Sequence, residues 1–321
     1  MTTYHTPVLL HESITGLNLQ PGGVYVDVTF GGGGHSREIL QQLKGGKLLA
    51  FDQDPDADEN LINDPRLILF SANFRFLKNF LKYNQITQIN GLLADLGVSS
   101  HHFDTVERGF TFQGNSPLDM RMNPRASIKA SDILNQYTPE KLYAMFKTYG
   151  EVENTGRLVA TIMEARPHTN FLTSNQLIDA IRPCIFKGAE NKYLAKVFQA
   201  LRIEVNQELD VLKALLSQCT ELITTGGRLV VITYHSLEDR IVKNFIKTGN
   251  FEGKVDKDFF GNAIAPFKPL HNKVITPSEE ELEINSRARS AKLRIAERIE
   301  DKIEKTQNEN KVTAKTQRRK D

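Results

Sequence analysis

The feature that most constrains this chain is a buried-strand pattern that runs straight into four consecutive glycines. Residues 24–35 read Val-Tyr-Val-Asp-Val-Thr-Phe-Gly-Gly-Gly-Gly-His, and a second apolar run ends in Asp52. Glycine adopts positive φ and lets the backbone approach a ligand that a Cβ would exclude. An acid about 20 residues after such a turn suits the two hydroxyls of a ribose. The layout therefore predicts a nucleoside-binding α/β unit.

The glycine run does not match the dinucleotide fingerprint G-x-G-x-x-G. Counted from Gly31, the sixth position is Ser36, and counted from Gly32 it is Arg37. No phosphate-loop motif occurs elsewhere. The pattern favours a nucleoside without a pyrophosphate, and S-adenosylmethionine fits. A turn that binds nothing is the alternative, although each glycine costs roughly 0.5–1 kcal/mol relative to alanine in ordered structure.

Composition indicates a cytoplasmic globular protein. The 321 residues are 40% hydrophobic, and the net charge of +2 does not by itself indicate nucleic-acid binding. Cys184 and Cys219 form neither a metal pattern nor a disulfide framework, which fits a reducing compartment. The chain has no long apolar run and a polar N-terminus, so we expect no membrane segment and no signal peptide.

Strand and helix patterns alternate over the first hundred residues, which predicts a parallel sheet with helices on both faces, a Rossmann-like α/β core. The predicted strands are Val24–Thr29, Lys47–Asp52, Leu67–Phe70 and Ile89–Asp95, and the helices are Ser36–Leu43 and Phe74–Tyr83. Ligands of such sheets bind beyond the carboxyl ends of the strands. Asp27, Asp52 and Asp95 lie at or near those ends.

The alternation then stops. Residues 106–203 show helical patterns without a buried strand, which predicts an inserted helical subdomain. The core pattern resumes with a helix over Val205–Ile223, a strand over Arg228–Thr233 and a short antiparallel strand over Leu293–Ala296. The predicted domains are a discontinuous core (1–105 and 204–300), the insert (106–203) and a disordered basic tail (301–321).

Four segments are too particular to be scaffold: Gly33-Gly34-His35, Asp95-Leu96-Gly97-Val98-Ser99-Ser100-His101-His102, Arg108-Gly109-Phe110-Thr111-Phe112 with Pro117-Leu118-Asp119-Met120-Arg121-Met122, and Tyr234-His235-Ser236-Leu237-Glu238-Asp239-Arg240. With His5–Leu10, Lys147–Glu151, Phe198–Ile203 and Asn285–Ser290, they resemble the ribosomal RNA small subunit methyltransferase H family, also called MraW, in colinear order up to the tail. The resemblance implies an S-adenosylmethionine-dependent methyltransferase core. It also implies methylation of cytidine N4 in the decoding region of 16S rRNA, with the small ribosomal subunit as partner.

The resemblance also implies a set of cofactor contacts: Gly33, Gly34, His35, Asp52, Phe74, Asp95 and His102. Asp52 would hold the ribose hydroxyls, so replacing it is expected to weaken cofactor binding with little effect on folding. The family more often has glutamine where this chain has His102. Taken without the resemblance, Phe74 fits ordinary helix core and His35 fits a surface position.

The proton acceptor stays open, with Asp95 and His235 as catalytic candidates. Other amino-methyltransferases carry an Asn/Asp/Ser-Pro-Pro-aromatic motif where this chain has Asp95-Leu96-Gly97-Val98, so their acceptor does not transfer. Ser236 with Asp239 forms an S-x-x-D signature, which predicts Ser236 as a helix N-cap. We expect no hydrolytic triad in this segment, because contiguous residues rarely converge. We also expect no metal site, because His101-His102 lacks further ligands.

Aromatic and basic residues of the insert and C-terminal region are candidates for RNA binding. Stacking and phosphate contacts recognise single-stranded RNA, and the candidates are Arg108, Phe110, Phe112, Arg121, Arg287 and Arg289. Core packing and solvated charge are the alternatives for each. Two other functions compete: a nucleotide-dependent oxidoreductase, which the broken fingerprint disfavours, and a non-catalytic cofactor-binding ribosome assembly factor.

Overall fold

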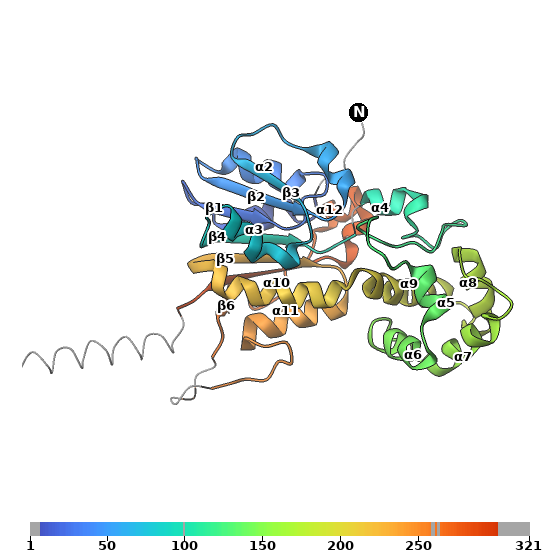
Figure 1. The fold of residues 1–321 in the computed structure, drawn as a ribbon. Helices are drawn as coiled ribbons and strands as arrows, with labels where there is room; N and C mark the ends of the chain where they lie inside the picture. Colours follow the sequence, from blue (N-terminus) through green and yellow to red (C-terminus); the bar gives the residue numbers. More distant parts are fainter. Residues whose placement is uncertain (1–6, 99, 258–260, 262–263, 301–321) are drawn as a thin grey trace, which may run out of the picture. The chain divides into compact units, whose positions relative to one another are not determined.

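The chain folds into two compact units. The computed structural model describes residues 7–98, 100–257, 261 and 264–300. Of these residues, those within 7–97 and 212–300 form the first unit, and those within 98–211 form the second (Figure 1). The second unit thus begins earlier and ends later than the insert expected at 106–203. The expected disordered tail, 301–321, lies outside the described residues. No helix of the described part is long and apolar enough to cross a bilayer.

The first unit is built on a mixed sheet. Within the described residues it has seven strands in the order β3-β2-β1-β4-β5-β7-β6. Their bounds are β1 (Val24–Asp27), β2 (Lys47–Asp52), β3 (Leu67–Ser71), β4 (Ile89–Asp95), β5 (Ile223–Thr233), β6 (Phe267–Pro269) and β7 (Lys292–Arg298). Strands β1 to β5 all run parallel to one another, whereas β7 runs antiparallel to β5 and to β6. The predicted parallel core and the antiparallel strand over Leu293–Ala296 are confirmed, but β6, which was not predicted, lies beyond β7 at the edge of the sheet.

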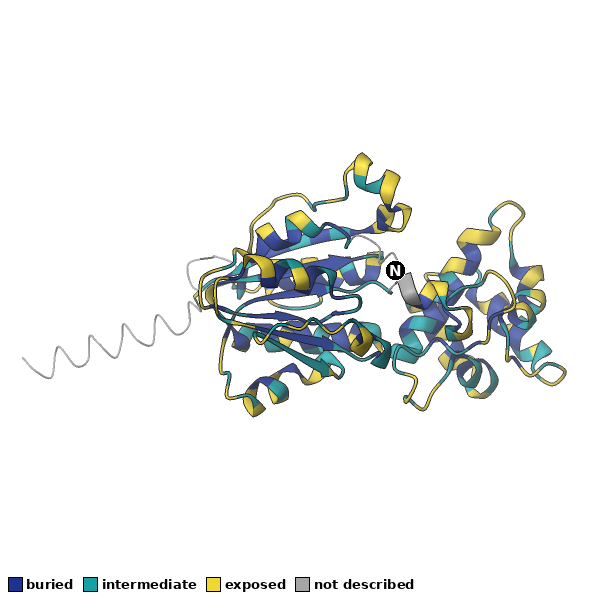
Figure 2. Ribbon diagram, turned by 90° about the horizontal axis from the view of Figure 1, so that it is seen from above, coloured by how far each residue is buried: buried dark blue, intermediate teal, exposed yellow. Residues whose placement is uncertain are grey.

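Helices cover both faces of this sheet, because side chains alternate between faces along each strand. Ile232 and Leu293 pack on one face with α1 (Leu10–Leu17) and α2 (Gly34–Gln42). Arg294 points to the opposite face, where its Nε donates to Asp239 Oδ1 of α11 (Ser236–Thr248) at 2.7 Å. Figure 2 shows the buried strands between helices with exposed outer surfaces.

Several further helices and turns belong to the first unit. The helix predicted over Phe74–Tyr83 consists of a 3-10 turn, η2 (Phe74–Phe76), followed by α3 (Leu77–Tyr83). The Asn73 side chain caps this turn by accepting a hydrogen bond from the Arg75 backbone N–H. The remaining elements are η1 (Pro55–Asn60), α10 (Glu208–Leu222, which starts in the second unit), α12 (Glu279–Ile284) and η5 (Ser286–Ser290).

The second unit is helical in its described part. Its elements are α4 (Ser100–Asp104), η3 (Val106–Arg108), α5 (Ala130–Gln136), α6 (Pro139–Thr148), α7 (Thr155–Ala165), α8 (Ser174–Ile181), η4 (Arg182–Cys184) and α9 (Glu190–Asn206). Phe146, Leu158 and Leu201 belong to one buried apolar cluster of this unit. Burying each such side chain is worth roughly 1.5–3 kcal/mol, so the unit has a core of its own.

The helix predicted over Val205–Ile223 is present as α10 but starts three residues later, at Glu208. Val205 belongs to the end of α9, and α10 begins at Glu208 after Gln207, whose φ is 51°. Arg202 clamps the break, because its Nε and Nη2 donate to Glu208 Oε1 and Oε2 at 2.8 and 3.0 Å. A residue in the left-handed conformation commonly ends a helix, and it is usually glycine or asparagine. Because Gln207 is neither, the sequence does not indicate that a helix ends here.

Candidate functional site

Three carboxylates lie at one edge of the sheet. Asp27 of β1 pairs in register with Ala50 of β2, two residues before Asp52. On its other side Asp27 pairs with Leu93 of β4, two residues before Asp95. Because the three strands are parallel, their carboxyl ends meet at the edge where ligands of such sheets bind. The predicted edge position of Asp27, Asp52 and Asp95 is confirmed.

The glycine turn follows β1 at this edge. Gly31 has a φ of 49°, and a Cβ there would meet no atom within 4 Å, so its backbone faces open space. Its N–H donates to Asp52 Oδ2 at 2.8 Å, and its carbonyl accepts from Asn60 Nδ2 at 3.2 Å. Gly34 is required for another reason, because a Cβ there would lie 2.2 Å from Pro7 Cγ. The turn is therefore fixed from both sides while its backbone stays open.

Asp52 has a structural role that the sequence did not reveal. Besides the Gly31 bond, its Oδ1 accepts the Asp54 N–H at 2.9 Å. Asp52 thus holds the glycine turn, and its replacement is expected to affect folding as well as the cofactor binding that the family resemblance implies.

Asp27 and His35 support the turn from within. Asp27 is 1% exposed, and its carboxylate accepts from the Thr29 N–H and, at 2.7 Å, from the Ser36 hydroxyl. His35 is 6% exposed, and its Nε2 lies 3.2 Å from the Val8 carbonyl oxygen. The alternative that His35 is a surface residue is therefore wrong. Ser36 and Thr29 are supporting residues that sequence reasoning missed.

The carboxyl group of Asp95, at the end of β4, has one oxygen without a hydrogen-bond partner in the part of the chain that the structure describes. Its Oδ1 is buried and has no hydrogen-bond partner among the described residues. Burial raises the pKa of the carboxyl, and the Asp27 charge adds to the rise. The His35 charge, Tyr234 and the Gly97 backbone act in the opposite direction and lower the pKa. Its own N–H donates to Thr29 Oγ1 at 2.7 Å, so the residue is held firmly in place.

His235 serves as a helix cap. Its side chain accepts from the Glu238 N–H at 3.4 Å, and Glu238 Oε2 accepts from the Tyr234 N–H at 3.0 Å. His235 Nε2 lies 3.1 Å from Glu238 Oε1. The prediction that Ser236 is the N-cap is wrong: Ser236 is the first residue of α11. The imidazole provides the acceptor one position earlier, which the S-x-x-D signature does not cover.

The other predicted cofactor and stacking residues are distributed over both units. Phe74 is half-buried in the first unit. His102 belongs to the second unit, is 6% exposed and lies 4.7 Å, centroid to centroid, from the ring of Phe110. Phe112 packs edge-to-face on Phe198 with centroids 5.4 Å apart. Phe110 and Phe112 are thus both engaged with the core of the second unit.

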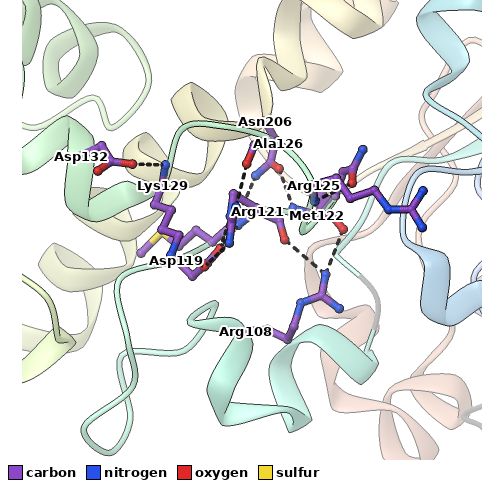
Figure 3. A network of polar contacts seen from close by, with 11 residues as sticks. Arg108, Asp119, Arg121, Met122, Arg125, Ala126, Lys129, Asp132 and Asn206 are labelled. Carbon is purple, nitrogen blue, oxygen red and sulfur yellow. Dashed lines mark hydrogen bonds and ion pairs between the residues drawn. The ribbon is translucent and has the colours of Figure 1, made fainter.

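Arg121 and Arg108 are held by contacts inside the second unit (Figure 3). Arg121 donates from Nε and Nη2 to the two oxygens of Asp119, both at 2.7 Å, and from Nη1 to the Ala126 carbonyl at 2.7 Å. Between the pair, Met120 has a φ of 61°. Arg108 Nη2 donates to the carbonyls of Arg121 and Met122. A phosphate would compete with these bonds. Arg287 and Arg289 are exposed on η5.

Similar proteins are known at the level of sequence. The model of the MraW methylase family matches residues 2–299. A Bacteroides thetaiotaomicron protein named Ribosomal RNA small subunit methyltransferase H is 57% identical over 297 residues, 92% of this chain and 98% of that protein. A Flavobacterium johnsoniae protein of the same name is 52% identical over 303 residues, 93% of this chain and 100% of that protein. Among solved structures, an rRNA methylase from Streptococcus thermophilus has 13% identity and a TM-score of 0.37, covering 91% of this chain and 96% of that chain.

Proposed function

Because the chain belongs to the MraW methylase family, we propose that it transfers the methyl group of S-adenosylmethionine to the N4 amine of a cytidine in the decoding region of 16S rRNA. The observation that carries the proposal is the buried Asp95 carboxyl beside an open glycine turn. It occurs in a chain 57% identical to a relative named for methylation of small-subunit ribosomal RNA.

The residues at the sheet edge fit the proposed cofactor. The open backbone at Gly31 admits a ligand in close contact, and Asp52 at the end of β2 stands where an acid suits ribose hydroxyls. The three edge carboxylates favour a ligand with a positive sulfonium and ammonium group. Gly33, Gly34 and His35 would border its methionine side, Phe74 its adenine, and Asp95 would complete the contacts that the first unit provides. The contact expected from His102, in the second unit, stays a prediction.

When bound, S-adenosylmethionine supplies a methyl group that is already activated. The protein then has to position the acceptor amine, and positioning supplies roughly 7–11 kcal/mol at best. Cytosine N4 is a weak nucleophile because its lone pair is delocalised into the ring. Asp95 is the better of the two acceptor candidates for an N4 proton, because it ends β4 at the edge where ligands of such sheets bind, whereas Nδ1 of His235 caps α11.

We assign RNA recognition to the second unit and to η5. A cytidine in folded RNA has to be unstacked before its amine reaches a pocket, at a cost of a few kcal/mol. Arg287 and Arg289 are exposed and suit phosphate contacts. Arg108, Arg121, Phe110 and Phe112 make contacts inside the second unit, and we assign them the role of shaping its RNA-binding surface.

Transfer of label from tritiated S-adenosylmethionine to small-subunit RNA tests the proposal. After digestion to nucleosides, the label is expected in N4-methylcytidine. Label in another nucleoside would refute the assigned position. Cofactor binding without any transfer, on free RNA and on assembled subunits alike, would instead indicate the non-catalytic assembly factor.

A further inference from the structure

Tyr234 covers the end of β4 from the neighbouring strand. Asp95 is paired with Ile232 of β5, and Tyr234 directly follows the last residue of that strand. The Tyr234 ring lies so close to Gly97 that a Cβ there would be 2.5 Å from Tyr234 Cε2. The Tyr234 hydroxyl faces the Asp95 carboxyl and lowers its pKa. Gly97 therefore makes room for a tyrosine that reaches this carboxyl.

The Asp95 carboxyl is held on one side and unpartnered on the other. Tyr234 and the Gly97 backbone face it and lower its pKa, whereas its buried Oδ1 has no partner in the described part of the chain. Buried polar atoms without a partner are uncommon in native structures and call for an explanation. A ligand that brings an N–H donor would complete the site.

We propose that Tyr234 is a positioning residue, which holds the Asp95 carboxyl so that its unpartnered Oδ1 accepts a hydrogen bond from the exocyclic amine of a bound nucleobase. The inference rests on the proposed function, which supplies two such amines, that of the target cytosine and that of the cofactor's adenine. Both present the same donor chemistry, and separate measurements distinguish them.

The test variant is Tyr234→Phe, which keeps the ring against Gly97 and removes only the hydroxyl. Tyr25→Phe is the matched control, because Tyr25 is a buried tyrosine of the same unit whose hydroxyl accepts the Gln20 N–H instead. Affinity for S-adenosylhomocysteine is measured by calorimetry, and kcat and KM are measured on small-subunit RNA over a range of pH. S-inosylhomocysteine, which lacks the adenine amine, is the control ligand.

If Oδ1 accepts the target amine, Tyr234→Phe lowers kcat by about tenfold or more and leaves S-adenosylhomocysteine affinity unchanged. If Oδ1 accepts the cofactor's amine, affinity for S-adenosylhomocysteine falls by a similar factor, while S-inosylhomocysteine binds both proteins equally. Either result supports the positioning role. Unchanged kcat and unchanged affinity, or equal losses in Tyr25→Phe, would overturn it.

The pH profile separates positioning from mere packing. The Tyr234 hydroxyl lowers the pKa of Asp95, so its loss moves the acid limb of the rate profile to higher pH. The other ionisable groups facing the pair are Asp27, His35, Glu238 and Glu281, and the variant leaves all four in place. An unmoved limb contradicts the inference.

Asp95→Asn is the second variant in case Tyr234→Phe folds poorly. It should lose both the acid limb and most of the rate, and an active variant with the wild-type pH profile would refute the role of Oδ1. A wild-type protein that binds cofactor but labels no RNA would refute the proposed function. The calorimetric comparison of the two tyrosine variants would still test the positioning of Asp95.

Discussion

Replacing Arg121 with alanine should destabilise the second unit, because its guanidinium makes three short hydrogen bonds within that unit. Two go to the Asp119 carboxylate, and the side chains of this pair are only 16% and 21% exposed. Breaking a buried ion pair costs about 3–5 kcal/mol. Lys129 Nζ remains 3.7 Å from Asp119 Oδ2 and offsets part of that cost. We therefore expect a loss near the lower limit, about 3 kcal/mol.

Hydrogen–deuterium exchange read by peptide mass spectrometry localises this loss. Since 1.4 kcal/mol is a factor of ten in an equilibrium constant, a loss of about 3 kcal/mol predicts roughly hundredfold faster exchange around residues 118–136. Arg182→Ala is the matched control: it breaks the Arg182–Asp179 pair of the same unit, whose side chains are 65% and 70% exposed. That exposed pair is worth only about 0–1 kcal/mol.

The result that would refute this reasoning is an Arg121→Ala protein whose exchange matches that of Arg182→Ala. If such a protein also bound RNA with a salt dependence reduced by about one counterion, Arg121 would be a phosphate ligand rather than a structural clamp.

Three further outcomes are expected. Asp52→Ala should lower both the thermal midpoint and the calorimetric affinity for S-adenosylhomocysteine, because it removes the acceptor of the Gly31 and Asp54 N–H groups at about 1.5–3 kcal/mol each; an unchanged midpoint would contradict the structural role. Asp95→Asn should stabilise the free protein at neutral pH, as chemical denaturation can measure. The pKa of Asp95 is raised in the folded state, so as pH rises above the ordinary carboxyl pKa the unfolded chain ionises first and wild-type stability falls until the folded pKa is passed; a variant that loses stability with pH in parallel with wild type would refute this. Replacing Arg287 and Arg289 together with alanine should weaken RNA binding, more so at low salt, and leave cofactor affinity unchanged; an unaltered salt dependence would exclude phosphate contacts there.

The strands of the core were predictable because each is an apolar run that ends at a turn or an acid. The bounds of β2 and β4 coincide with the predicted ones for this reason. The break between α9 and α10 was not predictable, since Gln207 adopts a left-handed conformation without being glycine or asparagine.

Site residues followed a similar division. Asp52 and Asp95 were found because they end strands, and a strand end is visible in the sequence. The clamp between Asp119 and Arg121 was not, because two charges separated by one residue resemble solvated charge until Met120 is seen in its left-handed conformation. Tyr234 is placed in contact with Asp95 only through the pairing of two strands distant in the sequence.

The pairing of β4 with β5 also has a consequence for synthesis of the chain. Asp95 of β4 pairs with Ile232 of β5, and the second unit lies between these two residues in the sequence. During synthesis, β4 is therefore the edge of the sheet until β5 has been made. At roughly 5–20 residues per second, that interval is on the order of ten seconds. An apolar edge strand left unpaired for this time is a template for wrong pairing. Early folding of the second unit would bring β5 to β4 sooner by shortening the effective loop between them, so variants that weaken its core should reduce the yield of folded protein from cells more than their equilibrium stability predicts.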